Sequence, residues 1–503
     1  MEGKRTDDQC IQGSKQKRIE ELENSTPLDT VRNDEAIRVL TTYQGDQTWT
    51  ELEEKKLVRK IDRRLLSIVV TTYGLQYYDK AMLSQAALFG LIEDLHLNTG
   101  IRYSFSSAIF YLGFICGAYP AILMAQRYPI ERVMFGIVCL WGVCLLTTAG
   151  CATYQGLYTQ RFFLGMLESG VSPAWIWYKK QEQAFRMGAW YCATGYVSII
   201  SPVINYGLGH ITGSLSPWRY MYLVAGLITI AWSFVILFLM PPEPVRAKRF
   251  SDRERYIAVA RMRSNNSGIR NTHFKRQQLL ELVSDAKFWL IFAIAFLVLV
   301  ANGPVSTFTP IIISDLGFSG LNSLLLVMPA GAIIGTIELM VPFVTMKFPG
   351  SRCYLVAVTV SLTLLASLLL WQLPTSAVGG RLFAVYILAS YGGGYAVLMG
   401  LQIANTAGYT KRSLGSSGIF VGYCLGNFLG PLVFKAEEAP HYTTGWITTI
   451  ATSAVAVVLT FVYRCLCAWE NRRRDKTGEM EAFQHAYNDD LTDKRNPQFR
   501  YTL

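Results

Sequence analysis

The chain contains about twelve apolar stretches that are each long enough to cross a lipid bilayer, which needs roughly 17 to 25 mainly apolar residues per helix. Of the 503 residues, 51% are hydrophobic and only 17% are charged. Apolar residues this frequent and this clustered are unusual in a soluble protein. The sequence therefore predicts an all-α membrane protein. The predicted spans are residues 65–88, 105–126, 133–151, 157–177, 187–210, 219–240, 288–311, 322–345, 352–372, 380–402, 412–434 and 444–468.

These spans fall into two sets of six, separated by one long polar segment. The first set occupies residues 65–240 and the second occupies 288–468. The segment between them, 241–287, opens with PPEPVRAKRF and is rich in Arg and Lys. Residues 1–64 and 469–503 are polar tails. We therefore expect two six-helix bundles that are joined by a basic cytoplasmic loop.

The positive residues indicate how the chain is oriented in the bilayer. Loops rich in Lys and Arg stay on the cytosolic side of a membrane. If the spans alternate in direction, QRYPIER (126–132), YKKQEQAFR (178–186), the central loop and ENRRRDK (470–476) all lie on one side. We therefore expect both tails to be cytoplasmic. The plasma membrane is the expected location.

Several classes of function are disfavoured by the same pattern. The net charge is +11, but the Lys and Arg residues lie in short clusters between apolar runs, which suits cytoplasmic loops better than a nucleic-acid surface. The ten cysteines include no CxxC or His-Cys cluster, so we expect no metal site. No nucleophile with a base and no GxGxxG after a strand is visible, so we expect neither an enzyme nor a bound cofactor. A monomer is the expected state.

Charged residues inside two of the spans need an explanation. Arg161 and Glu168 lie seven residues apart in the fourth span. Seven residues turn an α-helix through about 700°, which leaves the two positions roughly 20° apart and about 10 Å apart along the axis. Asp79 and Lys80 lie within the first span. A charge at the bilayer centre costs about 2.5 to 3.5 kcal/mol, so all four side chains need compensating partners.

Two interpretations of these four charges remain open. They can form fixed buried ion pairs that set the register of the bundle. Alternatively, both helices face a central cavity, where Asp79 or Glu168 neutralises Arg161 or Lys80 until a substrate anion takes its place. An acid beside a base in a cavity that water can reach is what proton coupling requires. The second interpretation predicts a transporter of an organic anion and protons.

The second set of spans has no comparable charge cluster. We expect Glu338 and Arg381, near the ends of their spans, to reach the membrane surface or a neighbouring loop. The amides of Gln402, Asn405 and Asn427 can hydrogen-bond a polar substrate, although hydrogen bonds between helices are an equal alternative.

The segment GYCLGNFLG (422–430) repeats Gly at every fourth residue. This spacing places the glycines on one helix face, where another backbone can approach closely. Such a face either packs statically or allows helices to slide during gating.

These features resemble the major facilitator superfamily. More narrowly, several strings are similar to the fungal allantoate permease group of anion:cation symporters, and the likeness runs from about residue 45 to the end. That group imports carboxylates such as allantoate, nicotinate or pantothenate. By this resemblance, Arg161 holds the substrate carboxylate, Glu168 and Asp79 carry protons, and Lys80 stands where Arg is common. The strings are GAYPAILMAQRYPIERVMFGIVCLWG (117–142), WYKKQEQAFRMGAWY (177–191), ANTAGYTKRSLGSSGIFVGYCLGNFLGPLVF (404–434) and DLTDKRNPQFRYTL (490–503).

The fourth span departs from that family pattern. Only AWI separates Pro173 from Trp177, whereas relatives have a longer apolar stretch there. From Arg161 to Tyr178 the helix is about 27 Å long, which is close to the hydrocarbon thickness. The span is either short in the protein or shortened by an error in the gene model. The alternatives to an active importer are therefore a transport-impaired family member and a non-transporting nutrient sensor.

Overall fold

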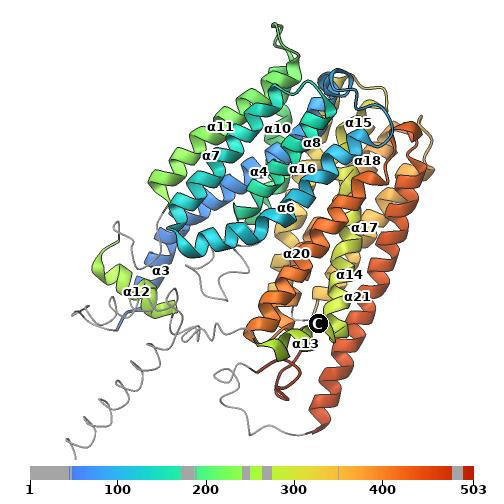
Figure 1. Ribbon diagram of the computed structural model, residues 1–503. Coiled ribbons are helices and arrows are strands. Elements are labelled where there is room, and N and C mark those ends of the chain that lie inside the picture. Colours follow the sequence, from blue (N-terminus) through green and yellow to red (C-terminus); the bar gives the residue numbers. More distant parts are fainter. Residues whose placement is uncertain are drawn as a thin grey trace, which may run out of the picture.

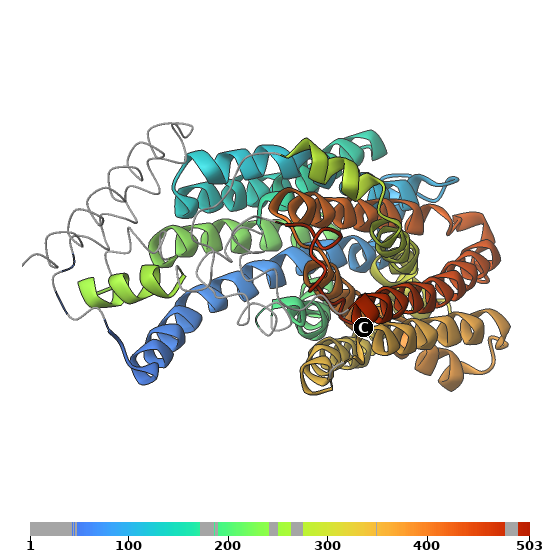
Figure 2. The same ribbon diagram turned by 90° about the horizontal axis from the view of Figure 1, so that it is seen from below.

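The computed structural model is a bundle of long helices (Figure 1). Its helices form two groups, and the view from below shows the first group (blue to green) beside the second (yellow to red) (Figure 2). No strand occurs in the part of the chain that the structure describes. That part comprises Tyr43, Gly45, residues 48–171, Arg186, and residues 190–240, 250–262, 275–348, 350–477 and 491–503.

The first group contains the helices of the first six predicted spans. Most of its members pack mainly on one another, as α6 does on α8 and α7 on α11, whereas α10 packs most extensively on a helix of the second group. Their bounds are α4 (Ser67–Ala86), α6 (Arg102–Arg127), α7 (Ile130–Ala149), α8 (Tyr154–Glu168), α10 (Ala193–Gly209) and α11 (Pro217–Leu239). Residues 172–185 and 187–189, which include the shortened part of the fourth span, lie outside the described residues.

The second group contains the helices of the last six predicted spans, and two of these spans are interrupted. Pro304 begins a π-helical turn after α14, because proline has no N–H group for the regular helix ladder. A short break at 389–390 separates α18 from α19. The bounds are α14 (Ala286–Val300), η7 (Pro304–Phe308), α15 (Thr309–Ser314), α16 (Gly320–Lys347), α17 (Arg352–Gln372), α18 (Val378–Leu388), α19 (Tyr391–Asn405), α20 (Tyr409–Leu432) and α21 (Thr443–Thr477).

Within the described ranges, eight of the helical segments are long and apolar enough by themselves to cross a membrane. The predicted spans that do not meet this standard are represented by α4, α8, α10 and α20. Helix α4 carries Asp79 and Lys80, and α8 and α10 both border residues that are not described. Helix α20 is rich in Gly and Ser. These helices cross a bilayer only as members of a bundle, because their neighbours cover the polar side chains.

Glycine brings α6 and α8 into backbone contact. A Cβ atom on Gly165 would overlap the carbonyl oxygen of Phe110, and one on Gly113 would overlap that of Phe162. Only glycine allows helices to approach this closely. This contact fixes the height and rotation of α8, and therefore the positions of its two charged side chains.

The repeated glycines of α20 receive the backbone of α14, as the sequence predicted. A Cβ atom on Gly426 would overlap the carbonyl oxygen of Phe296, and one on Gly430 would approach that of Val300 to 2.5 Å. Both helices belong to the second group. The contact therefore favours static packing within that group over sliding between groups.

The two groups meet along two pairs of helices, α10 with α16 and α6 with α20. At the end of the molecule opposite the C-terminus, the Tyr103 hydroxyl donates to the Thr307 carbonyl at 2.8 Å. The Ser104 hydroxyl donates to the Phe434 carbonyl at 2.7 Å. Hydrogen bonds therefore close this end of the α6 interface.

The other end of the molecule carries α3 (Glu51–Ile61), α12 (Asp252–Met262) and α13 (Arg276–Val283), at the lower side of Figure 1. Helix α3 starts at a capping box formed by Thr50 and Glu53. It is tied to α12 by an ion pair of 3.0 Å between Arg253 and Glu53 and by another of 2.7 Å between Lys60 and Glu254. The helix then continues through a π-helical turn into α4, so the first membrane helix extends from an ordered N-terminal segment.

Candidate functional site

A polar cavity lies between the two groups of helices. It is lined by residues of α4, α6, α10, α16, α19 and α20 and of the segment from α14 to α15. Its volume is about 70 Å³, whereas pockets for small ligands usually measure about 300 to 1,000 Å³. In this conformation the cavity can hold a few water molecules, and a larger solute requires the groups to move apart.

One face of α4 forms a wall of this cavity. Tyr73, Tyr77, Lys80 and Ser84 all line it, and their spacing of four, three and four residues places them on one side of the helix. The next residue position on a helix is turned by about 100°, so Asp79 points away from Lys80 and is 0% exposed. Lys80 was predicted from the sequence as a site residue, whereas Tyr73 and Tyr77 on the same face were not, although their spacing from Lys80 could have revealed them.

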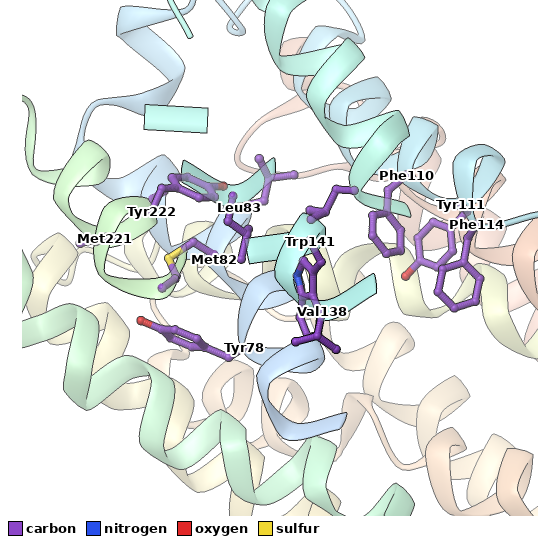
Figure 3. Close-up of a cluster of buried hydrophobic side chains, with 14 of the residues drawn as sticks. Tyr78, Met82, Leu83, Phe110, Tyr111, Phe114, Val138, Trp141, Met221 and Tyr222 are labelled. Carbon is purple, nitrogen blue, oxygen red and sulfur yellow. The ribbon is translucent and has the colours of Figure 1, made fainter. Parts of the chain in front are cut away.

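Lys80 is a cavity cation that is surrounded by aromatic rings. Its Nζ atom lies 5.1 Å from the ring centres of both Phe110 and Phe114, and 6.0 Å from that of Tyr111. Figure 3 shows these three rings grouped together in the buried core. Ring faces attract a cation. Within the described residues, no carboxylate lies within 4.0 Å of Lys80.

Arg161 and Glu168 lie on the buried face of α8, as their spacing predicted, and their side chains are 2% and 1% exposed. Arg161 Nη2 donates to the hydroxyl of Tyr222 at 3.0 Å. The carboxylate oxygens of Glu168 and of Asp79 accept no hydrogen bond of regular geometry from the described residues, although the donor side chains of Gln76 and Trp141 lie beside them. Three functional groups that can carry charge are therefore buried with few or no partners.

The four charged side chains of the first group form one electrostatic cluster. Asp79 interacts with Glu168, Arg161 and Lys80, and Glu168 also interacts with the two cations. Among the described residues, however, no two of these four approach within 4.0 Å as an ion pair. The four side chains therefore form neither fixed buried ion pairs nor ion pairs that face the cavity, which were the two arrangements that the sequence suggested.

Only Lys80 of these four residues lines the cavity. The expectation that all of them face one open space does not hold in this conformation. Trp141 and Tyr222 fill the space around Asp79 and Arg161, and both aromatic side chains are 0% exposed. Figure 3 shows them in the same buried cluster as the rings near Lys80. Asp79, Arg161 and Glu168 are therefore buried among packed side chains and do not line the cavity.

Asn427 lies one layer behind the cavity wall. Its side-chain oxygen accepts a hydrogen bond from Asn302, which lines the cavity, and Asn302 in turn accepts one from Tyr391. The amide nitrogen of Asn427 donates to the carbonyl of Tyr423 at 2.8 Å. Asn427 therefore orients a cavity residue and does not itself form the wall.

The other two candidate amides lie away from the cavity wall. Gln402 accepts a hydrogen bond of 2.9 Å from Ser416. Asn405 donates to the Tyr463 hydroxyl at 2.7 Å and to the Thr502 carbonyl at 2.9 Å. These bonds use the amides to join helices and to hold the C-terminal segment, which is the alternative that the sequence left open.

Glu338 does not reach the membrane surface, and the expectation for this residue was wrong. Its side chain is 3% exposed, and it lines the cavity. Its Oε2 atom accepts a hydrogen bond of 2.6 Å from the hydroxyl of Thr194. Gly331, Gly335 and Glu338 share one face of α16 through their spacing of four and three residues. This small-residue face packs on α10, and it was the signal that could have placed Glu338 inside.

Arg381 is also buried, at 4% exposed. It interacts electrostatically with Asp315, which follows the end of α15. Contact with a neighbouring loop was one of the two expectations for this residue, and snorkelling to the surface was the other.

Comparison with known proteins identifies the fold and the family. Residues 69–431 match the Major Facilitator Superfamily. An uncharacterized transporter of Schizosaccharomyces pombe is 37% identical over 485 residues, which cover 93% of this chain and 89% of that protein. The allantoate permease of Saccharomyces cerevisiae is 30% identical over 497 residues, which cover 93% of this chain and 90% of that protein.

A solved structure shows the same architecture. The xylose transporter XylE from E. coli, in a partially occluded inward open conformation, superposes with a TM-score of 0.60 at 13% identity, covering 80% of this chain and 97% of that one. The matching family and relatives are transporters and not enzymes. The chain is therefore a multi-pass membrane protein that belongs to the major facilitator superfamily of transporters.

Proposed function

We propose that the protein imports a small organic carboxylate together with protons by alternating access. The observation that carries this proposal is Lys80, a cation that lines the cavity between the two groups of helices with no carboxylate partner among the described residues. Two carboxyl groups that accept no hydrogen bond of regular geometry from the described residues, those of Asp79 and Glu168, lie close enough to interact with it. An anion site and proton carriers are thus within one cluster.

The proposed roles follow from burial and position. Lys80 offers the first contact for a substrate carboxylate, and Arg161 stands behind it as the second cation of the cluster. A carboxyl group that is sealed from water and lacks hydrogen-bond donors is costly in its ionised form. Glu168 and Asp79 can therefore each hold a proton while the site is closed, and can release it when water or a free cation reaches them.

Support for the substrate class comes from both the site and the relatives. Its lining combines Lys80 with tyrosines and Asn302, which suits a polar anion better than an apolar solute. A relative of similar length is named as an allantoate permease. Allantoate, nicotinate and pantothenate are the candidate substrates. Because the closed cavity is small, the two groups must rock about it during transport.

Uptake measurements test this function. Cells that lack their own permeases should accumulate labelled allantoate, nicotinate or pantothenate when they express the protein, and uptake should increase at acidic external pH. Glu168→Gln should flatten this pH profile, because a side-chain amide cannot take up and release a proton as a carboxyl group does. Glu93→Gln is the matched control, since Glu93 is exposed in the short helix α5 (Leu91–Asp94), which precedes α6. If uptake by the wild type does not depend on pH, or if Glu168→Gln keeps the wild-type pH profile, Glu168 is not the proton carrier.

A second pair of variants separates the two cations. Lys80→Met should raise the substrate concentration needed for half-maximal uptake, and Arg161→Lys should also impair transport because an ammonium lacks the planar two-pronged geometry. Normal affinity in Lys80→Met together with a strong loss in Arg161→Lys would assign the carboxylate to Arg161. Normal affinity in Arg161→Lys would assign it to Lys80.

The shortened fourth span supports one further candidate, a family member that binds its ligand but does not transport it. The shortening falls on residues outside the described part of the chain. Binding of a carboxylate to the purified protein without any uptake would favour this candidate or a nutrient sensor. We also propose a monomer in the plasma membrane with both tails cytoplasmic, which fluorescence microscopy and protease protection of tagged tails would test.

A further inference from the structure

Thr194 and Glu338 connect the two groups of helices at their closest approach. Thr194 lies in α10 and Glu338 lies in α16, and they are joined by the hydrogen bond of 2.6 Å. Both are buried, at 5% and 3% exposed. One residue further along, a Cβ atom on Gly195 would overlap the backbone nitrogen of Gly335. The carboxyl group of Glu338 therefore lies in a tightly packed interface between the two helices.

Glu338 has no cationic partner in the described part of the chain. No Lys, Arg or His within that part lies close enough to form an ion pair with it. Lys80 lines the same cavity, but its ammonium rests among aromatic rings of α6. Arg381, on α18, which also packs on α16, interacts with Asp315 instead. The titratable groups that face Glu338 from packed helices are Tyr73, Tyr77, Tyr191, Cys192 and Tyr391.

These neighbours bear on the charge that Glu338 can carry. Tyrosines and a cysteine provide no positive charge at neutral pH. The Thr194 hydroxyl and the backbone N–H of Gly195 donate to the Glu338 carboxyl group. Even with these donors, a buried carboxylate that faces no cation is costly, whereas a carboxylate open to bulk water is not. The bond to Thr194 must also break whenever α10 and α16 separate, because it joins opposite groups. Closure of this interface is therefore linked to the protonation of Glu338.

We propose that Glu338 and Thr194 form a proton-dependent latch, in which Glu338 takes up a proton as α10 and α16 close and releases it to water as they part. This inference rests on the proposed proton-coupled function and adds a proton carrier in the second group of helices. The Thr194 hydroxyl lies 2.6 Å from Oε2 and 2.9 Å from the Tyr191 carbonyl oxygen, so either carboxyl oxygen of Glu338 can carry the proton. Asp79 and Glu168 then respond to the substrate anion, while Glu338 responds to the movement between groups.

The variant Glu338→Gln tests the latch, because the amide keeps an acceptor for Thr194 but cannot lose a proton. In proteoliposomes with labelled allantoate, exchange of external for internal substrate at equal pH should persist. Accumulation driven by a pH gradient should fall several-fold. Equal losses of exchange and of gradient-driven accumulation would overturn the latch, because they would indicate only a structural or binding role.

A second measurement does not depend on any substrate. The thermal unfolding temperature of the purified wild type should fall relative to that of Glu338→Gln as the pH rises from acidic to alkaline, because only the wild type must keep a proton in its closed interface. Thr194→Val retains the carboxyl group and should keep the wild-type pH trend at a lower unfolding temperature. A difference between wild type and Glu338→Gln that is independent of pH would overturn the inference.

The two experiments distinguish failure of the latch from failure of the proposed function. If no carboxylate is transported while the unfolding temperatures show the expected pH trend, the proposed function fails and the protonation of Glu338 stands. If the wild type transports with protons but Glu338→Gln behaves as the wild type in both measurements, the latch fails and the function stands.

Discussion

Arg161 reaches from α8 to α11, where its Nη2 atom donates a hydrogen bond of 3.0 Å to the hydroxyl of Tyr222. The side chains are 2% and 0% exposed, and Arg161 Nε has no hydrogen-bond partner among the described residues. Tyr222 therefore supports the guanidinium group beside Asp79 and Glu168. A phenol is an uncharged acceptor, so it holds the cation without neutralising it.

Tyr222→Phe should destabilise the protein by about 1.5 to 3 kcal/mol, because it removes a hydrogen bond to a buried charged group. The unfolding temperature of the protein in detergent measures this loss. Tyr220→Phe is the matched control: its hydroxyl accepts only a long, exposed bond of 3.4 Å from Leu215, so we expect a change within about 0.5 kcal/mol. Equal effects of the two variants would show that Tyr222 does not support Arg161.

Much of the fold could be predicted because a bilayer imposes a minimum length on apolar segments. In the described part of the chain, every predicted span coincides at least in part with a helix or a pair of helices, and even the Gly repeat of α20 packs as its spacing indicated. Residues 172–177 and 187–189 of the fourth and fifth predicted spans lie outside that part. The break in the helix after α14, at Pro304, was harder to predict from the sequence. Proline is tolerated in membrane helices when neighbours satisfy the backbone, so its presence alone does not fix a break.

The candidate site was harder to predict, because hydropathy does not show which way a helix is turned. The spacing of Arg161 and Glu168 correctly placed them on one face. It could not show that this face packs against Tyr222 and lies away from the cavity wall, since this depends on packing between helices distant in sequence. Glu338 was misplaced for a related reason: only its small-residue neighbours on α16, and not its distance from the helix end, indicate that it faces α10.

Gly165→Ala should disrupt the contact between α6 and α8, because the added methyl group would overlap the Phe110 carbonyl oxygen. The backbone cannot yield as a side chain can, so we expect a large loss of folded protein, beyond the roughly 1 to 3 kcal/mol of ordinary overpacking. Size-exclusion chromatography of a fluorescent fusion in detergent measures folded yield.

Gly136→Ala provides the control for that variant. An added Cβ atom at Gly136 meets no atom within 4 Å, and alanine favours a helix over glycine by up to about 1 kcal/mol. Its yield should equal or exceed that of the wild type. A normal yield for Gly165→Ala would contradict the close contact.

Asn405→Ala should reduce stability without altering substrate affinity. The amide is engaged by Tyr463 and by both backbone groups of Thr502, and it lies outside the cavity wall. Removing it leaves buried groups without partners, which costs about 1 to 3 kcal/mol. Unfolding temperature and the KM of uptake measure the two effects separately. A higher KM at unchanged stability would instead indicate that Asn405 contributes to the substrate site.

Lys411 holds the central loop and the C-terminal segment together. Its Nζ atom forms ion pairs of 2.9 Å with Glu281, 2.8 Å with Asp285 and 2.7 Å with Asp493, and its side chain is only 2% exposed. Burial alone would raise the pKa of Asp285, but the charges of Lys411 and Lys287 outweigh this effect and lower it. A carboxyl group whose pKa is lowered by folding adds stability that is complete above its unfolded pKa of about 3.9 and disappears as the pH falls through its folded value.

Lys411→Gln should therefore destabilise the protein by about 3 to 5 kcal/mol at neutral pH, because it leaves buried carboxylates unpaired. The difference from wild type should shrink below about pH 4, where those carboxylates become protonated. Arg500→Gln is the control, since its ion pair with Asp475 is 39% and 63% exposed, and such surface pairs contribute about 0 to 1 kcal/mol. Unfolding in denaturant over a range of pH measures both variants. A difference for Lys411→Gln that stays constant down to acidic pH would mean that the carboxylates are not what Lys411 stabilises.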